Sequence, residues 1–108
     1  MNLHIDDFKN DDVATLKLSG EIDAYTAPQL KEKLLGYVKE YDEVQVDLEK
    51  VNYMDSTGLG VFISALKTSK ENESKFKLIN LQENVYRLFN ITGLNEVIDI
   101  ENTVQGGM

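Results

Sequence analysis

Polar and hydrophobic residues alternate over the first part of the chain, and this pattern predicts two β-strands. Residues 3–8 (LHIDDF) and 13–20 (VATLKLSG) flank the turn-rich segment KNDD, which is typical of a β-hairpin. In the second segment Ala14, Leu16 and Leu18 alternate with polar residues. One face of this strand should therefore be buried, and the other should face water.

A change to helical spacing follows the hairpin. Thr26 and Gln29 have the spacing of a capping box, and Pro28 lies in the first turn, where its missing N–H costs nothing. Apolar and aromatic residues then recur on one face, at Leu30, Leu34, Tyr37, Val38 and Tyr41. This segment is therefore predicted to be an amphipathic helix.

The rest of the chain alternates between the two spacings. Strands are predicted at residues 44–48, 75–81 and 96–100. One predicted helix carries Leu59, Phe62, Ile63 and Leu66, and the other carries Val85, Leu88 and Phe89 and should end near Gly93.

The resulting order, ββαβαβαβ, predicts a single α/β domain over residues 1–108. Strand–helix–strand alternation implies parallel strands joined by right-handed crossovers. We therefore expect a mixed, mostly parallel sheet of about four or five strands, with an N-terminal hairpin and helices packed on it. The tail from about residue 101, ENTVQGGM, is expected to be loose.

Three connections should leave the sheet at one edge, because they follow parallel strands. They contain the segments GEIDAYT, VNYMDST and NLQEN. Open α/β sheets place their sites beyond the carboxyl ends of the strands. The segment VNYMDSTGLG, residues 51–60, is therefore predicted to lie beside Asp23 at the edge where a site is expected.

The charge and composition exclude several classes of partner. The formal net charge is −8, from 19 acidic and 11 basic residues, and such a field repels nucleic acid and anionic membranes. The chain has no cysteine, no secretory signal and no apolar run long enough for a membrane span. We expect a soluble, cytoplasmic protein that binds neither nucleic acid nor membrane.

Enzymatic interpretations of residues 51–60 lack essential groups. A nucleophilic Ser56 needs a base, and the single histidine, His4, lies in the first predicted strand. The glycines are not part of a P-loop, and a carboxylate cluster of Glu21, Asp23 and Asp55 is more often solvated than metal-binding. We expect no catalytic residue, metal or cofactor, with a small enzyme or nucleotide binder using Asp23, Asp55 and Ser56 as the alternative.

The start of the second predicted helix has an ordinary part and an unusual part. Asp55 or Ser56 is a common type of N-cap, but Gly58 and Gly60 each cost roughly 0.8–1.0 kcal/mol inside a helix relative to alanine. A stripe of small, uncharged residues lies opposite the predicted core face, at Thr57, Gly60, Val61 and Ser64. Periodicity leaves two interpretations open, a docking surface or packing against a neighbouring element.

Ser56 stands at the head of this stripe, where a phosphate could act as a switch. A phosphoserine carries a charge of about −1.5 to −2 at neutral pH, and a helix N-terminus tolerates that charge. The fold would be kept, while a partner pressed against the stripe would meet a bulky dianion.

The motifs LSGEIDAYTAPQL and VDLEKVNYMDSTGLGVFISAL, with the ββαβαβαβ order, resemble the STAS (SpoIIAA-like) domain of bacterial anti-sigma-factor antagonists of the RsbV type. The resemblance covers about residues 1–100. It implies an anti-anti-sigma factor whose unphosphorylated form binds an anti-sigma factor that is also a serine kinase (RsbW-like). Binding releases a stress-response sigma factor of the sigma-B type. Phosphorylation by the kinase breaks the complex, and a PP2C-type phosphatase restores it.

Matched by position, the resemblance implies that Ser56 is the phosphorylated residue and that the chain catalyses nothing. Together with the small-residue stripe, it gives an expected partner-binding surface made of Asp23, Asp55, Ser56, Thr57, Gly58, Gly60, Val61 and Ser64. The alternative within this family is a STAS scaffold module of a stress-sensing assembly, or an antagonist in another sigma pathway.

Overall fold

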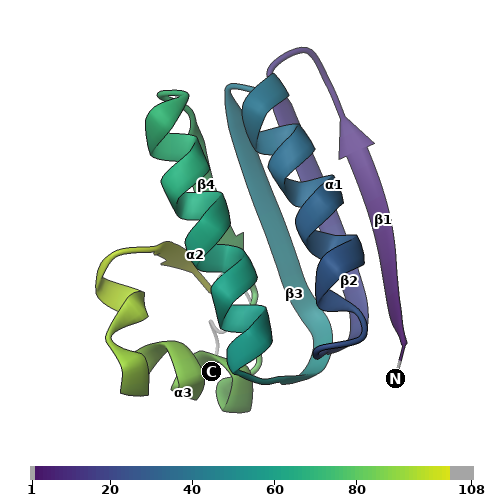
Figure 1. The fold of residues 1–108 in the computed structure, drawn as a ribbon, viewed down its shortest axis with the longest axis vertical. Helices are drawn as coiled ribbons and strands as arrows, with labels where there is room; N and C mark the ends of the chain where they lie inside the picture. Colours follow the sequence, from purple (N-terminus) through teal and green to yellow (C-terminus); the bar gives the residue numbers. More distant parts are fainter. Residues whose placement is uncertain (1, 103–108) are drawn as a thin grey trace.

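A computed structural model describes residues 2–102, and its elements follow the predicted order (Figure 1). The elements are β1 (Leu3–Lys9), β2 (Val13–Ile22), α1 (Ala27–Glu40), β3 (Glu43–Met54), α2 (Ser56–Glu71), β4 (Lys75–Ile79), α3 (Glu83–Thr92), a 3-10 helix η1 (Leu94–Glu96) and β5 (Asp99–Glu101). The only unpredicted element among the described residues is η1.

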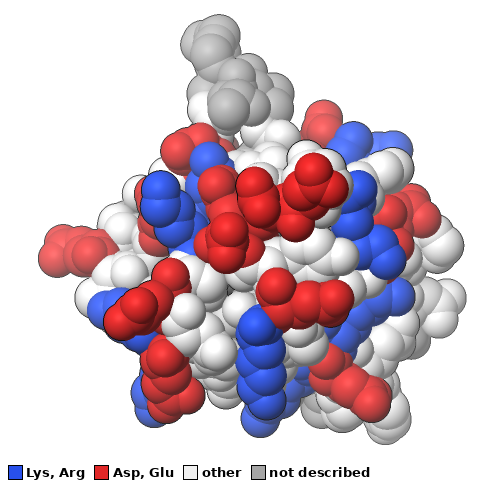
Figure 2. Space-filling model, turned by 90° about the horizontal axis from the view of Figure 1, so that it is seen from above, with Lys and Arg blue, Asp and Glu red and all other residues white. Residues whose placement is uncertain are grey.

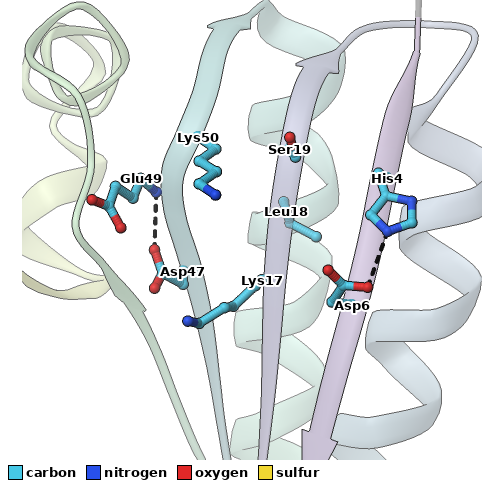
Figure 3. A pocket seen from close by; sticks show the side chains of 8 residues that line it. All are labelled: His4, Asp6, Lys17, Leu18, Ser19, Asp47, Glu49 and Lys50. Carbon is cyan, nitrogen blue, oxygen red and sulfur yellow. Dashed lines mark hydrogen bonds and ion pairs between the residues drawn. The ribbon is translucent and has the colours of Figure 1, made fainter.

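The sheet has the strand order β1-β2-β3-β4-β5. β1 pairs with β2 in the antiparallel sense, and every later pair is parallel, so the predicted mixed α/β fold is confirmed. Helices α1 and α2 lie side by side over one face of the sheet, and α3 lies at the lower left (Figure 1). The opposite face of the strands β1 to β3 is open, with the helices behind it in Figure 3.

The core lies between the sheet and its helices, where the predicted periodicities place apolar side chains. Ala14, Leu16 and Leu18 are at most 2% exposed, which confirms the alternation predicted for β2. The ring of Phe62 in α2 packs between those of Phe76 and Phe89, with ring centroids 6.3 and 6.2 Å apart. The fully buried residues of α1 are Leu30, Leu34 and Val38, while Tyr37 and Tyr41 pack at its margin.

The central strands extend further than predicted. β2 continues to Ile22 and β3 to Met54, so the segments GEI and VNYM belong to strands rather than to loops. The pairing of β2 with β3 shifts register twice, between Lys17 and Ser19 and between Gly20 and Glu21. Such bulges interrupt the two-residue period, and this is why alternation could not reveal the strand ends.

The C-terminal part also differs from the prediction. β4 ends at Ile79 because Asn80 has a positive φ of 59° and leaves the strand, and β5 begins at Asp99 because η1 uses the preceding residues. Glu101 lies in β5, and the side chain of Asn102 accepts a hydrogen bond from the Leu81 N–H at 2.8 Å. These first two residues of the expected loose tail are therefore held. Residues 103–108 lie outside the described part.

The amino ends of β3 and β4 form one end of the molecule, together with the hairpin turn and the carboxyl ends of α1 and α2. Backbone bonds join its loops, from Glu43 N–H to the Asp12 carbonyl at 3.1 Å and from Lys75 N–H to the Asp42 carbonyl at 2.8 Å. Figure 2 looks onto this end and shows acidic and basic side chains intermixed. Between residues 2 and 102, no helix is long and apolar enough to cross a membrane.

Candidate functional site

The connections from β2 to α1 and from β3 to α2 meet at the carboxyl end of the sheet, at the bottom of Figure 1. The backbone N–H of Asp55 donates to the carbonyl of Ile22 at 3.3 Å. This bond joins the two connections directly, so the loop residue Asp23 and the first residue of α2, Ser56, lie near each other at the carboxyl end of the sheet. The segment of residues 51–60 therefore ends beside Asp23, as the strand order predicted.

Asp55, and not Ser56, is the N-cap of α2. Its backbone is extended, and its Oδ1 accepts from the N–H groups of Thr57 at 2.9 Å and Gly58 at 3.4 Å. Ser56 is the first residue of the helix and is exposed. Its hydroxyl makes no hydrogen bond to any described residue. The helix start is therefore held without the hydroxyl of Ser56, which is left accessible.

The capping box predicted for α1 is wrong, because its threonine is engaged elsewhere. The Thr26 hydroxyl donates to the Glu21 carbonyl at 3.0 Å and accepts from the Asp23 N–H at 2.9 Å. Asp23 in turn accepts at Oδ1 from the N–H groups of Tyr25 and Thr26. The spacing of Thr26 and Gln29 cannot reveal that Asp23, rather than Gln29, accepts from the Thr26 N–H.

Asp23 is only 8% exposed, so it shapes its loop rather than presenting a free carboxylate. The same loop displays Tyr25, which is 86% exposed, and the end of β3 displays Tyr53, which is 48% exposed. Sequence reasoning missed both aromatic residues, because a single exposed side chain near a loop leaves no periodic signal.

The two glycines of α2 differ in how much space surrounds them. A Cβ at Gly58 would lie 2.6 Å from Met54 Cγ and 2.8 Å from Ile22 Cγ2, so the helix approaches the sheet too closely for a side chain there. A Cβ at Gly60 would meet nothing within 4 Å. The first glycine is explained by packing, while the second leaves open space on the surface.

That space belongs to a groove between the starts of α1 and α2, with a volume of about 490 Å³. Its lining residues are Ala24, Ala27, Pro28, Lys31, Ser56, Thr57, Gly60 and Val61. Val61 is 4% exposed, so it packs beneath the groove and is not the open surface residue that the stripe suggested. Ser64 is half-buried and does not line the groove. Packing therefore accounts for Val61, and the docking interpretation stays a prediction for the exposed residues Thr57 and Gly60.

Of the described residues that line the groove, none is a histidine, the usual base for a nucleophilic serine. Figure 3 shows His4 on β1, on the open face of the sheet, with its Nε2 3.0 Å from Asp6 Oδ1. There it lines a hollow of about 320 Å³, whose other residues include Lys17 and Asp47 with opposite charges. Within residues 2–102, no group of three histidine or carboxylate side chains could hold a metal ion.

Titratable groups with shifted pKa values lie away from the groove, where β1 meets the carboxyl-terminal half of α1. The Tyr37 hydroxyl donates to the Asp7 carboxylate, which lowers the pKa of Asp7 and raises that of Tyr37. Lys33 adds an ion pair to Asp7 at 3.6 Å, and the ammonium of Lys9 lies over the Tyr37 ring, 5.6 Å from its centroid. This cluster ties the edge strand to the helix.

Similar proteins share both the sequence and the fold of this chain. The family model described as the STAS domain matches residues 4–107. The anti-sigma-B factor antagonist of Bacillus subtilis (strain 168) is 43% identical over 108 residues, covering 100% of this chain and 99% of the relative. The protein of the same name from Listeria monocytogenes is 47% identical over 110 residues, covering 100% of this chain and 96% of the relative.

A solved structure gives the same picture for the fold. The crystal structure of an anti-sigma factor antagonist from Mycobacterium paratuberculosis matches with a TM-score of 0.85 and 23% identity. The match covers 95% of this chain and 88% of the other. At 23% identity, this match supports the fold of the chain and says nothing of its function.

Proposed function

Since this chain belongs to the STAS domain family, we propose that it is an anti-sigma-factor antagonist. Its unphosphorylated form binds an anti-sigma factor and so releases a stress-response sigma factor of the sigma-B type. The names of the Bacillus and Listeria relatives, which match over the full chain, support this role. The whole chain acts as one STAS domain and works as a binding partner rather than as an enzyme.

The observation that carries the proposal is the separation of two tasks at the start of α2. Asp55 caps the helix, while the exposed Ser56 hydroxyl contributes no hydrogen bond to the fold. A phosphate on Ser56 therefore changes the surface at the head of the groove without removing a contact that the fold needs. This is the property that a reversible binding switch requires.

The proposed partner surface is centred on the groove. Ser56, Thr57 and Gly60 contact the anti-sigma factor directly, and Tyr25 and Tyr53 supply exposed aromatic area of the kind enriched in interfaces. The remaining residues shape this surface from within or lie beside it: Asp23, Asp55, Gly58, Val61 and Ser64.

The anti-sigma factor is in our proposal also the serine kinase (RsbW-like) that modifies Ser56. The Ser56 Oγ forms a bond to the γ-phosphorus of ATP, the bond between the β- and γ-phosphates breaks, and ADP leaves with its electron pair. The hydroxyl proton passes to a base of the kinase. A PP2C-type phosphatase removes the phosphate, and these reactions take place in the cytoplasm. The antagonist itself holds no cofactor.

Incubation with the kinase and ATP, followed by intact-mass analysis, tests the assignment. We expect one added phosphate on the wild type and on Thr57→Ala, and none on Ser56→Ala. Thr57 is the matched control, because it is the neighbouring exposed hydroxyl. Equal modification of Ser56→Ala would contradict the assignment of Ser56.

A further inference from the structure

The groove at Ser56 is lined by one charged side chain, and that side chain has no partner among the residues that the structure describes. Lys31 of α1 lines the groove opposite the residues of α2. It forms no ion pair or hydrogen bond with any residue between 2 and 102. On the same helix, Lys33 is already paired with Asp7 at 3.6 Å. An unpaired cation is thus available in the groove that Ser56 heads.

The first turn of α2 offers a phosphate fewer free N–H groups than an uncapped helix N-terminus would. The N–H groups of Thr57 and Gly58 already donate to the Asp55 carboxylate. A phosphate on Ser56 would therefore lie beside that carboxylate as a second anion. The phosphate and the Asp55 carboxylate would repel each other, so a cation from another element would stabilise the phosphorylated form.

The other charged groups near this edge do not supply it. Glu21 and Asp23, at the end of β2 and in its loop, are acidic, as is Asp55 itself. On α3, Arg87 lies 3.8 Å from Glu83. Lys50 lines the hollow on the open face of the sheet rather than the groove. Lys31 is the cation that the groove leaves available.

We propose that Lys31 binds the phosphate of phosphorylated Ser56, and that this ion pair fills the groove over Gly60. The inference rests on the proposed phosphorylation of Ser56 and concerns its consequence inside this chain. Apart from its chain neighbours and the backbone of its own helix, no described atom lies within 4 Å of a Cβ at Gly60, which leaves room for the pair between the two helices. Charge-assisted bonds between an ammonium and a phosphate are among the stronger hydrogen bonds in proteins.

This contact gives the switch a second component. A phosphate alone would exclude a partner by its bulk and charge at the head of the groove. The Lys31 pair would in addition occupy the groove itself and remove the cation from any carboxylate that the partner offers. In the phosphorylated form, the chain's own residues would then block the groove.

The test is a ³¹P NMR titration of protein that carries phosphoserine at position 56, installed during translation so that no kinase is needed. A nearby cation favours the dianion, so Lys31 should lower the second pKa of the phosphate, which is ordinarily about 6. We expect Lys31→Gln to raise this pKa by roughly 0.5 pH unit. Lys31→Arg should keep it near the wild-type value.

Lys33→Gln is the matched control, because it removes the same charge from the same helix but away from the groove. A rise for Lys31→Gln that exceeds the rise for Lys33→Gln supports the proposal. An equal or smaller rise overturns it, since the effect would then come from net charge alone. No anti-sigma factor is present, so a failure of the proposed function would appear separately, as absent binding of the unphosphorylated chain.

Discussion

The two ends of the helix layer differ in how many of their polar side chains form bonds within the fold. At the carboxyl end of the sheet, a groove is lined by an exposed serine and by a lysine that pairs with none of residues 2–102. At the other end, backbone bonds join the loops, and the nearby cluster of Asp7, Lys33 and Tyr37 ties a strand to a helix. The charged groups there serve the fold or face water, while the groove end also carries two groups, the Ser56 hydroxyl and the Lys31 ammonium, that bond to no described residue.

The same division separates Gly58 from Gly60, although they lie in one turn of one helix. Gly58 is needed because Met54 and Ile22 leave no space for a Cβ, and Gly60 has space that nothing in the described fold fills. A residue that costs helix stability without serving the packing is expected to serve a contact with another molecule. Substitutions at these positions can therefore separate stability from binding.

The largest expected effect comes from Gly58→Ala. The added methyl group must push Met54 and Ile22 away, and overpacking of this kind costs about 1–3 kcal/mol of unfolding free energy, which the helix propensity of alanine offsets by only roughly 0.8–1.0 kcal/mol. The matched variant Gly60→Ala meets no atom and should gain roughly 0.8–1.0 kcal/mol from helix propensity. Urea denaturation of both variants measures the difference. Equal changes in stability would remove the distinction between the two glycines.

Gly60→Leu should weaken binding while leaving the fold intact. The larger side chain projects into the groove, so we expect the affinity for the anti-sigma factor to fall at least tenfold, or about 1.4 kcal/mol. Calorimetric titration gives the affinity, and circular dichroism verifies the fold. Wild-type affinity with leucine at this position would show that the partner does not use the groove.

Asp55→Ala should lower stability by about 1 kcal/mol, because the Thr57 and Gly58 N–H groups lose their acceptor. Asp11→Ala, at the opposite end of the molecule, should change stability by less than about 0.5 kcal/mol. Thermal or urea unfolding of the two variants compares a carboxylate that holds a helix with one that lies in a turn. A silent Asp55→Ala variant would contradict the capping role.

The smallest effect concerns pH and the Asp7 cluster. The Tyr37 hydroxyl and Lys33 lower the pKa of Asp7 below its ordinary value of 3.8. The stability that this provides is therefore fully present above pH 3.8. It is lost as the pH falls through the lowered pKa that Asp7 has in the folded protein. Tyr37→Phe should reduce the loss of stability in this acidic range without changing binding at neutral pH. An unchanged acid unfolding profile would contradict this role for Tyr37.

Periodicity was sufficient to predict the order of the elements, since buried residues such as Leu16, Leu34 and Phe62 repeat at strand or helix spacing. It failed where register shifts hide the continuation of β3 to Met54, and where Asp23 rather than Gln29 accepts from the Thr26 N–H. Those features depend on pairing between segments, which a local pattern does not contain.

The edge position of Asp23 and the placement of Ser56 at the head of α2 could be predicted, because both follow from strand order and helix start. The groove and the position of Lys31 in it could not, because they arise from the packing of α1 against α2. The exposure of Tyr25 could not either, because a single loop residue leaves no periodic signal. The small-residue stripe gave two open interpretations. Only three-dimensional packing separates buried Val61 from exposed Gly60.

The central claim is that the state of Ser56 decides whether the groove end binds. The most direct measurement is the affinity of the purified anti-sigma factor for wild type, Ser56→Ala and the Ser56-phosphorylated chain, each verified as folded. We predict that the first two bind within about threefold of each other and that the phosphorylated chain binds at least a hundredfold more weakly, a difference of about 2.7 kcal/mol. A folded, fully phosphorylated chain that binds as tightly as the wild type would contradict the account.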